Sequence, residues 1–313
     1  RGAPANALAP AQRALALAQA RGEASRVSPL QAEVLVGRAE LALNRDGAAL
    51  RLLAAVEAGQ GGRLPGADLH DAAEHLGQYL TRSADYSRAR RAWSIAANSA
   101  ESARSSPAYA RANALVWHAA SIMLESTTRR RGRLDADAAV QARRDLNEAL
   151  ALFQPLAERE AERGRLTTAQ AGYAQALAWR AVLRAKVVSD GVDLPPEEPD
   201  AQSDGAREVD VPTPAHSPRC RVRFSYTRDY SLLFPDRALS EGQLAGMAVR
   251  FTVDEAGQVT ESVPVAVVGR DDFVRAVENS WRHWRVERLD GSSADCRMAM
   301  SVLVPMQFTI APR

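Results

Sequence analysis

The sequence predicts a two-domain protein of the α plus (α+β) class: a helical domain over residues 1–188, a linker over 189–218 and a small antiparallel sheet domain over 219–313. Three observations predict this division. Apolar residues in the first part recur at spacings of three and four, which is typical of helices that bury one stripe. The middle part holds six prolines and eight acids against one base. In the last part apolar and polar residues alternate, which is typical of half-buried strands.

The composition excludes several classes of protein. Hydrophobic residues make up 46% of the 313 residues and charged residues 25%, which excludes general disorder. With 19 Gly, 16 Pro and 2 Cys, the chain is neither collagen-like nor a disulfide-dense scaffold. No apolar run reaches the ~18 residues of a membrane-spanning helix. The net charge of +2 does not favour a nucleic-acid partner. Lys186 is the only lysine, so a lysine nucleophile or phosphate loop is implausible elsewhere.

Several helix starts can be predicted within residues 1–188. Serine or threonine caps and first-turn prolines match the unsatisfied N–H groups of a helix start, and they predict starts at Ser28-Pro29, Pro65-Gly66, Ser106-Pro107 and Thr167-Thr168. About eight helices fit the first part. Their short connections favour antiparallel neighbours.

A pattern of small and large residues occurs twice in the helical part. Gly37 is followed at +12, +16 and +19 by Ala49, Leu53 and Val56, and Gly77 by Ala89, Trp93 and Ala96. Small residues allow two helices to cross closely, so the pattern resembles the tetratricopeptide repeat, although the copies lie 40 residues apart instead of about 34. An unrelated helical bundle is the alternative. In both cases the helices are expected to form an interaction surface for an unknown protein partner.

The three parts differ in charge. The helical part carries 26 bases and 18 acids (+8), the linker 1 base and 8 acids (−7), and the last part 13 bases and 12 acids (+1). The linker has few large apolar residues, and it cannot bury enough surface to offset its ordering entropy. Its acids either keep it soluble or let it lie against the basic helical domain.

The last part begins its regular pattern with a hairpin. Residues Met247–Val253 alternate, Asp254–Gly257 form a turn, and the return strand runs over Val259–Val267 with one interruption of its alternation. Asp271 opens a helix whose apolar stripe consists of Phe273, Val277, Trp281 and Trp284. The order strand, strand, helix, strand predicts an antiparallel sheet with one helix on its face.

The final strand, Met298–Ile310, is expected at an edge of this sheet. Its apolar set should face the helix stripe: Met298, Met300, Val302, Val304, Met306, Phe308 and Ile310. The opposite set, Ser301, Leu303 and Gln307, should face outward. Pro305 lacks an N–H, and prolines in sheets are confined mainly to edge strands.

Several motifs of the last part resemble, in order and spacing, the TonB C-terminal domain family. The family pattern places Tyr-Pro before a Gly-led alternating strand, an Asp-x-x-Gly turn, a helix ending near a Trp-Arg element and a final apolar strand. The matching residues here include Phe234, Pro235, Gly246, Gly257 and Trp284. The match spans about 80 residues and says nothing about residues 1–188. Phe234 replaces the usual Tyr, Pro264 interrupts the second strand, and residues 220–226 read as an added strand.

The resemblance implies an energy-transducing protein that couples to outer-membrane transport. Such a domain captures an extended peptide of a TonB-dependent outer-membrane receptor by adding it to a sheet edge. Here that edge would be Ser301, Val302, Leu303, Val304 and Gln307. The family also implies a periplasmic location and an anchor before Arg1 that reaches an inner-membrane motor complex. The alternative is a periplasmic adaptor that binds two protein partners without transducing energy.

The two cysteines, Cys220 and Cys296, each begin a strand-like segment of the last part. If these segments pair, the sulfurs can meet, and we expect a disulfide, with free buried thiols as the alternative. The bridge would add roughly 4 kcal/mol by the chain-entropy model. It would indicate an oxidising compartment such as the periplasm.

No residue pattern predicts catalysis or metal binding. His70 and His75 flank Glu74, but they are i and i+5, about 140° apart on a helix, whereas a zinc-binding helix needs i and i+4. His118 is expected to be a packing residue and His283 a surface residue. No Gly-x-Ser-x-Gly motif and no acid–histidine pair of a nucleophilic triad occurs. We therefore expect no enzymatic activity, no cofactor and no metal.

Overall fold

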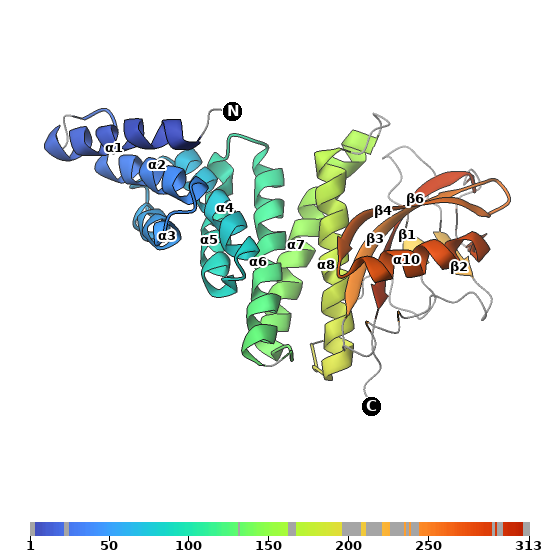
Figure 1. Cartoon of the computed structure of the whole chain (residues 1–313). Helices are drawn as coiled ribbons and strands as arrows, with labels where there is room; N and C mark the ends of the chain where they lie inside the picture. Colours follow the sequence, from blue (N-terminus) through green and yellow to red (C-terminus); the bar gives the residue numbers. More distant parts are fainter. Residues whose placement is uncertain are drawn as a thin grey trace. The chain divides into compact units, whose positions relative to one another are not determined.

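The structure is a computed structural model. It describes residues 4–21, 25–130, 132–161, 167–195, 208–210, 221–225, 235, 238, 244–289, 292 and 297–308 (Figure 1). Contacts divide the chain into two units, Arg1–Glu125 and Ser126–Arg313. The described residues are mostly helical, with a small C-terminal antiparallel sheet region. The coarse prediction, helices followed by a sheet, is therefore confirmed, while the contacts divide the chain at a different place from the composition.

The first unit consists of helices that pair with their neighbours in sequence. They are α1 (Pro4–Arg21), α2 (Pro29–Ala42), α3 (Ala48–Ala58), α4 (Gly66–Arg82), α5 (Tyr86–Ser99), the short η2 (Ala100–Ser102) and most of α6 (Pro107–Arg129). The predicted starts of α2, α4 and α6 are confirmed. Ser28 caps α2 in a capping box with Gln31, which satisfies two N–H groups at the helix start.

Glycines lie where consecutive helices cross in this unit. A Cβ at Gly37 of α2 would be 3.1 Å from the Cβ of Leu52 in α3. A Cβ at Gly77 of α4 would be 2.6 Å from the ring of Trp93 in α5. Trp93 is fully buried, and its Nε1 donates a hydrogen bond to Thr81 Oγ1 at 3.0 Å. Both glycines of the twofold pattern therefore allow close helix crossings, as the spacing predicted.

The second unit begins with a long helix pair, α7 (Ala136–Ala161) and α8 (Thr168–Asp190). Thr167 caps α8 in a capping box with Gln170, as predicted for this start. A Cβ at Gly172 of α8 would lie 2.5 Å from the ring of Phe153 in α7, so these helices also cross closely. At the other end of α8, Asp190 accepts a hydrogen bond from the Leu134 N–H at 2.6 Å.

The main sheet of the second unit has the order β4-β3-β6. Its strands are β3 (Ala245–Val253), β4 (Val259–Val268) and β6 (Met300–Phe308), all antiparallel to their neighbours. The predicted hairpin is confirmed. The final strand is shorter than predicted, because Met298 lies before it and Ile310 lies outside the described residues.

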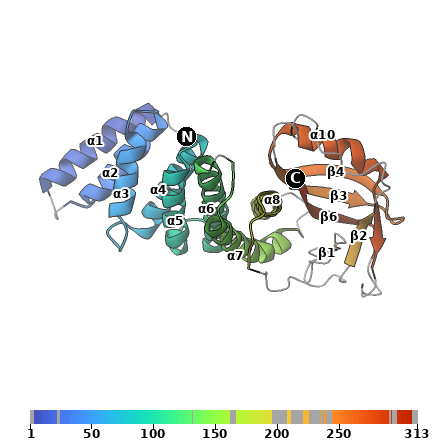
Figure 2. The same ribbon diagram turned by 90° about the horizontal axis from the view of Figure 1, so that it is seen from below.

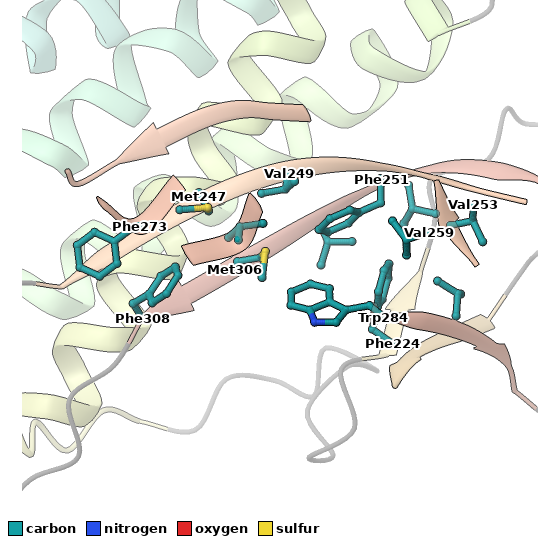
Figure 3. Packing of buried hydrophobic residues seen from close by; sticks show 14 of the residues in the cluster. Phe224, Met247, Val249, Phe251, Val253, Val259, Phe273, Trp284, Met306 and Phe308 are labelled. Carbon is teal, nitrogen blue, oxygen red and sulfur yellow. The ribbon is translucent and has the colours of Figure 1, made fainter. Parts of the chain in front are cut away.

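Helix α10 (Asp271–Ser280) covers one face of this sheet, and a short helix, η4 (Trp281–His283), follows it. Figure 3 shows the resulting core, in which Phe224 and Trp284 both lie close to the ring of Phe251 in β3. The ring centroids of Phe251 and Trp284 are 5.6 Å apart, and those of Phe273 and Phe308 are 4.7 Å apart. Such buried aromatic pairs dominate the stability of a small core.

Helix α8 covers the opposite face of the same sheet. The small residues Ala174 and Ala178 of α8 pack on Ala248 and Ala266 of β3 and β4. A Cβ at Gly246 of β3 would lie 2.3 Å from the Ala178 carbonyl oxygen, so the helix backbone lies almost directly on the strand. Figure 2 shows α8 end-on beside the strands. The composition placed α8 in the helical domain, whereas its contacts place it in the unit that contains the sheet.

A second sheet has the order β1-β2-β5, with β1 (Glu208–Asp210), β2 (Arg221–Ser225) and β5 (Arg285–Arg288). It contributes Val222, Phe224 and Val286 to the core under α10. The Val286 N–H donates to the Gly257 carbonyl at 2.7 Å and thus links the second sheet to the β3–β4 turn. The predicted order of one sheet and one helix therefore needs correction, because β5 and a second sheet are also present.

A β-bulge explains the interrupted alternation of β4. The register with β3 shifts between Ala248, paired with Ala266, and Val249, paired with Pro264. The extra residue, Val265, consequently changes face, and Val265 and Ala266 both pack towards α8. Pro264 is tolerated here because β4 is an end strand of the sheet.

Candidate functional site

Strand β6 is an end strand of the main sheet. It pairs with β3 over nine consecutive positions, from Ala245↔Phe308 to Val253↔Met300, without a register shift. Within the described ranges no strand pairs with β6 on the side away from β3. We call this side the outer edge of β6. Among the described strands, the final strand therefore has the edge position that the sequence predicted.

The position of Pro305 shows which backbone groups of β6 point to the outer edge. It lies opposite Ala248. Because proline has no N–H, this position cannot be a hydrogen-bonded pair of the antiparallel ladder. The neighbouring pairs, Met247↔Met306 and Val249↔Val304, therefore form the hydrogen bonds to β3. The N–H and C=O groups of residues 301, 303 and 307 then point away from β3.

The outer edge consequently offers a short set of backbone donors and acceptors. Ser301 and Leu303 each present a donor and an acceptor, and Gln307 presents another pair after the interruption at Pro305. Unpaired groups in such a row are the template to which an extended chain adds as a further strand. The stretch best suited to a partner strand is therefore 301–304, where no proline removes a donor.

The side chains of β6 alternate as predicted, with one correction. Val302, Val304, Met306 and Phe308 are buried under α10, and Met298 and Met300 are half-buried against the same core. On the other face Ser301 is exposed. Leu303, predicted to face outward, does point away from α10, but it packs against the cluster formed by α8 and the sheet. The sequence did not show that α8 covers this face.

The outer edge of β4 differs from that of β6. Its ladder with β3 shifts register twice, between Ala248 and Val249 and between Thr252 and Val253. Pro264 lies within it, and Glu261 accepts a hydrogen bond from Thr252 Oγ1 at 2.9 Å. Bulges, prolines and charges are the usual features by which proteins protect an edge from further pairing. Of the two edges, that of β6 is the better template.

The described residues of the family-like motif contribute to packing and to backbone conformation. Gly246 lies under α8, and Trp284 is buried in the core. Gly257 has φ of +78°, and a Cβ there would be 2.4 Å from the Val286 carbonyl oxygen, so both backbone conformation and space require glycine. Pro235 is half-buried. Phe234 lies outside the described residues.

The predicted disulfide also lies outside the described residues, because neither Cys220 nor Cys296 is among them. It stays a prediction.

The histidines do not form a metal site in the part of the chain that the structure describes, where no cluster of three or more metal-binding residues occurs. His70 is buried, and its Nδ1 lies 2.9 Å from the Ala96 carbonyl oxygen. Burial lowers the pKa of His75, and the nearby guanidinium groups of Arg38 and Arg82 lower it further. His118 is buried in α6 and His283 is exposed, as predicted.

None of the described helices combines the length and the apolar character needed to cross a membrane. Comparison of the chain with protein-family models, with curated proteins and with solved structures finds no match in any of the three. The resemblance to the TonB C-terminal domain family therefore stays a prediction that rests on the sequence motifs.

Proposed function

We propose that the C-terminal sheet captures an extended peptide by strand addition at the outer edge of β6. The observation that carries the proposal is the nine-position ladder between β3 and β6, which has no register shift and leaves the other side of β6 to a partner. Main-chain hydrogen bonds would supply the affinity, while the buried side chains of β6 supply stability.

We further propose that the partner is an extended segment of a TonB-dependent outer-membrane receptor and that the protein works in the periplasm. The sequence motifs around Gly246, Gly257 and Trp284 support the receptor class, since they resemble those of the TonB C-terminal domain family. A disulfide between Cys220 and Cys296, which stays a prediction, would agree with this compartment. In this proposal an anchor before Arg1 connects the protein to an inner-membrane motor complex.

A periplasmic adaptor is the second candidate. The paired helices of the first unit, which cross closely at Gly37 and Gly77, support it, because stacked helix pairs of repeat proteins form extended surfaces that bind other proteins. In this case the helices bind one partner and the sheet another, and no energy is transduced.

Ser301 allows a sharp test of the edge. Its side chain is exposed and its N–H points to the outer edge, so Ser301→Pro removes a donor for the partner but none for β3. Ser301→Ala is the matched control, since it keeps the N–H and changes only the side chain. The probe is a fluorescein-labelled receptor-derived extended peptide, and binding is followed by anisotropy together with a melting curve.

We expect Ser301→Ala to bind like the unsubstituted protein and Ser301→Pro to lose at least about tenfold in affinity, while both melt as the unsubstituted protein does. Equal binding by Ser301→Pro would contradict capture at this edge. If the intact protein binds no such peptide, and the amides of β6 that face the outer edge are strongly protected from exchange, the edge is occupied and the adaptor replaces the transducer.

A further inference from the structure

A short acidic segment of the chain itself is added to the second sheet. Strand β1, Glu208–Asp210, pairs antiparallel with β2 on the side away from β5. The sequence predicted this segment as part of the linker over 189–218. The structure thus contains a strand addition within the chain, in which part of the acidic region occupies an edge of a sheet.

The register of this pairing places acidic residues of β1 opposite arginines of β2. Glu208 lies opposite Arg223, Asp210 opposite Arg221, and Val209 opposite Val222 between them. Arg223 is also opposite Glu287 of β5 and donates a hydrogen bond to it at 2.9 Å. Acids therefore lie on both sides of Arg223 across the three strands. Opposite charges at directly opposed positions stabilise an antiparallel pair, and like charges destabilise it.

The electrostatics of β5 agree with this arrangement. The hydrogen bonds from Arg223 and Ser225 lower the pKa of the Glu287 carboxyl. The exposed Arg223 of β2 thus favours a carboxylate at the opposed position of a neighbouring strand. Its side chains at Val222 and Phe224 are buried and hold it in place, so β2 does not depend on β1 for its position.

Strand β1 is short. It has three residues, whereas strands in globular proteins most often have about five or six. Ten residues, 211–220, connect β1 to β2. A short connection gives the attached segment an effective concentration on the order of millimolar, which holds a weak strand in place without high intrinsic affinity.

We propose that the outer edge of β2 is a second strand-addition site, that its ligand is an extended segment with the pattern acidic–apolar–acidic, and that β1 occupies it as a replaceable strand of the chain itself. A partner with the same pattern and a longer strand displaces β1. This proposal does not rest on the function proposed for β6, since it concerns a different strand of a different sheet.

The test uses the full chain and two double variants of equal charge. E208R/D210R places like charges opposite Arg223 and Arg221 and so releases β1. E197R/E198R makes the same change of charge in the acidic region before β1. The probes are a labelled peptide with the sequence of residues 206–211 and a control peptide with arginine at its two acidic positions. Binding is measured by anisotropy at low and high salt.

We expect E208R/D210R to bind the acidic peptide at least tenfold more tightly than the unsubstituted protein and E197R/E198R do. The affinity should fall with salt, because exposed charges are screened, and the control peptide should not bind. Equal affinity of all three proteins, absence of binding to E208R/D210R, or equal binding of both peptides overturns the proposal. Melting curves of E208R/D210R and of the unsubstituted protein complete the test. We expect the second unit of E208R/D210R to stay folded, because a replaceable strand can be released without unfolding the unit. Unfolding by E208R/D210R also overturns it.

Discussion

Replacing Gly246 by alanine tests the packing of α8 on the sheet, which the sequence did not predict. The added Cβ would lie 2.3 Å from the Ala178 carbonyl oxygen and 2.7 Å from the Val182 backbone nitrogen. Both are backbone atoms of α8, so no side chain can rotate to make room. Ordinary contact begins at 3.4 Å, and the helix therefore has to retreat by about 1.1 Å at this point.

The retreat disturbs the cluster that joins α8 to the sheet. Ala174, Ala178, Ala248 and Ala266 are small and buried, and they lose contact together when the helix moves. Adding a methyl group to a well-packed interior costs typically about 1–3 kcal/mol. The lower entropy of the unfolded alanine chain offsets about 0.4–1 kcal/mol of it. We expect a net loss of roughly 1–2 kcal/mol in the second unit, or about 2–8 °C in its Tm.

Gly37→Ala is the matched control in the first unit. Its Cβ would lie 3.1 Å from the Cβ and Cδ1 of Leu52, so the helices need to separate by only a few tenths of an ångström, and alanine favours the helix by about 1 kcal/mol. We expect Gly37→Ala to be close to neutral. Urea unfolding gives the free energies, and amide exchange in α8 identifies the unit affected. Unchanged stability and unchanged exchange in Gly246→Ala would refute the packing of α8 on β3.

Three further predictions concern the core, the pH dependence and the cysteines. Phe251→Ala removes a fully buried ring in contact with Trp284, and we expect a loss of about 3–5 kcal/mol in urea unfolding followed by tryptophan fluorescence. The lowered pKa of His75 means that the unfolded chain binds more protons on acidification, so stability falls as the pH drops below about 6.5, and His75→Gln should flatten this slope in pH-dependent unfolding. Alkylation of denatured, unreduced protein should leave Cys220 and Cys296 unlabelled, and two labels by intact mass would show free thiols.

Local chemistry explains what the sequence determined. A cap needs only a residue and the three that follow it, so Ser28 and Thr167 mark the starts of α2 and α8. The alternation of β3 and β6 needs only one buried face, and these strands were predicted to within a few residues. Pro305 alone indicated an edge strand. The small residues at Gly37 and Gly77 indicated close crossings, because the helices that meet there are neighbours in sequence.

Three features, β5, β1 and the bulge in β4, have sequence patterns too short or too irregular to be identified from the sequence. β5 has one buried residue, Val286, among charged ones, so its pattern is too short to distinguish from a loop. β1 consists of two acids around Val209 in a proline-rich region. Its pairing depends on the arginines of β2, a strand that begins after ten intervening residues. The interruption in β4 was visible, but only its register with β3 identifies it as a bulge at Val265.

The tertiary structure alone decided where α8 belongs. Its buried residues lie around most of the helix, since Gly172 meets Phe153 of α7 while Ala174 and Ala178 meet the sheet. A helix that is apolar on several sides has the same sequence pattern whether its second neighbour is another helix or a sheet. The choice depends on Gly246, about 70 residues further along the chain, whose missing side chain lets the helix backbone approach β3. Spacing within a helix carries no information about such a distant surface, and so the covering of Leu303 followed only from the packed structure.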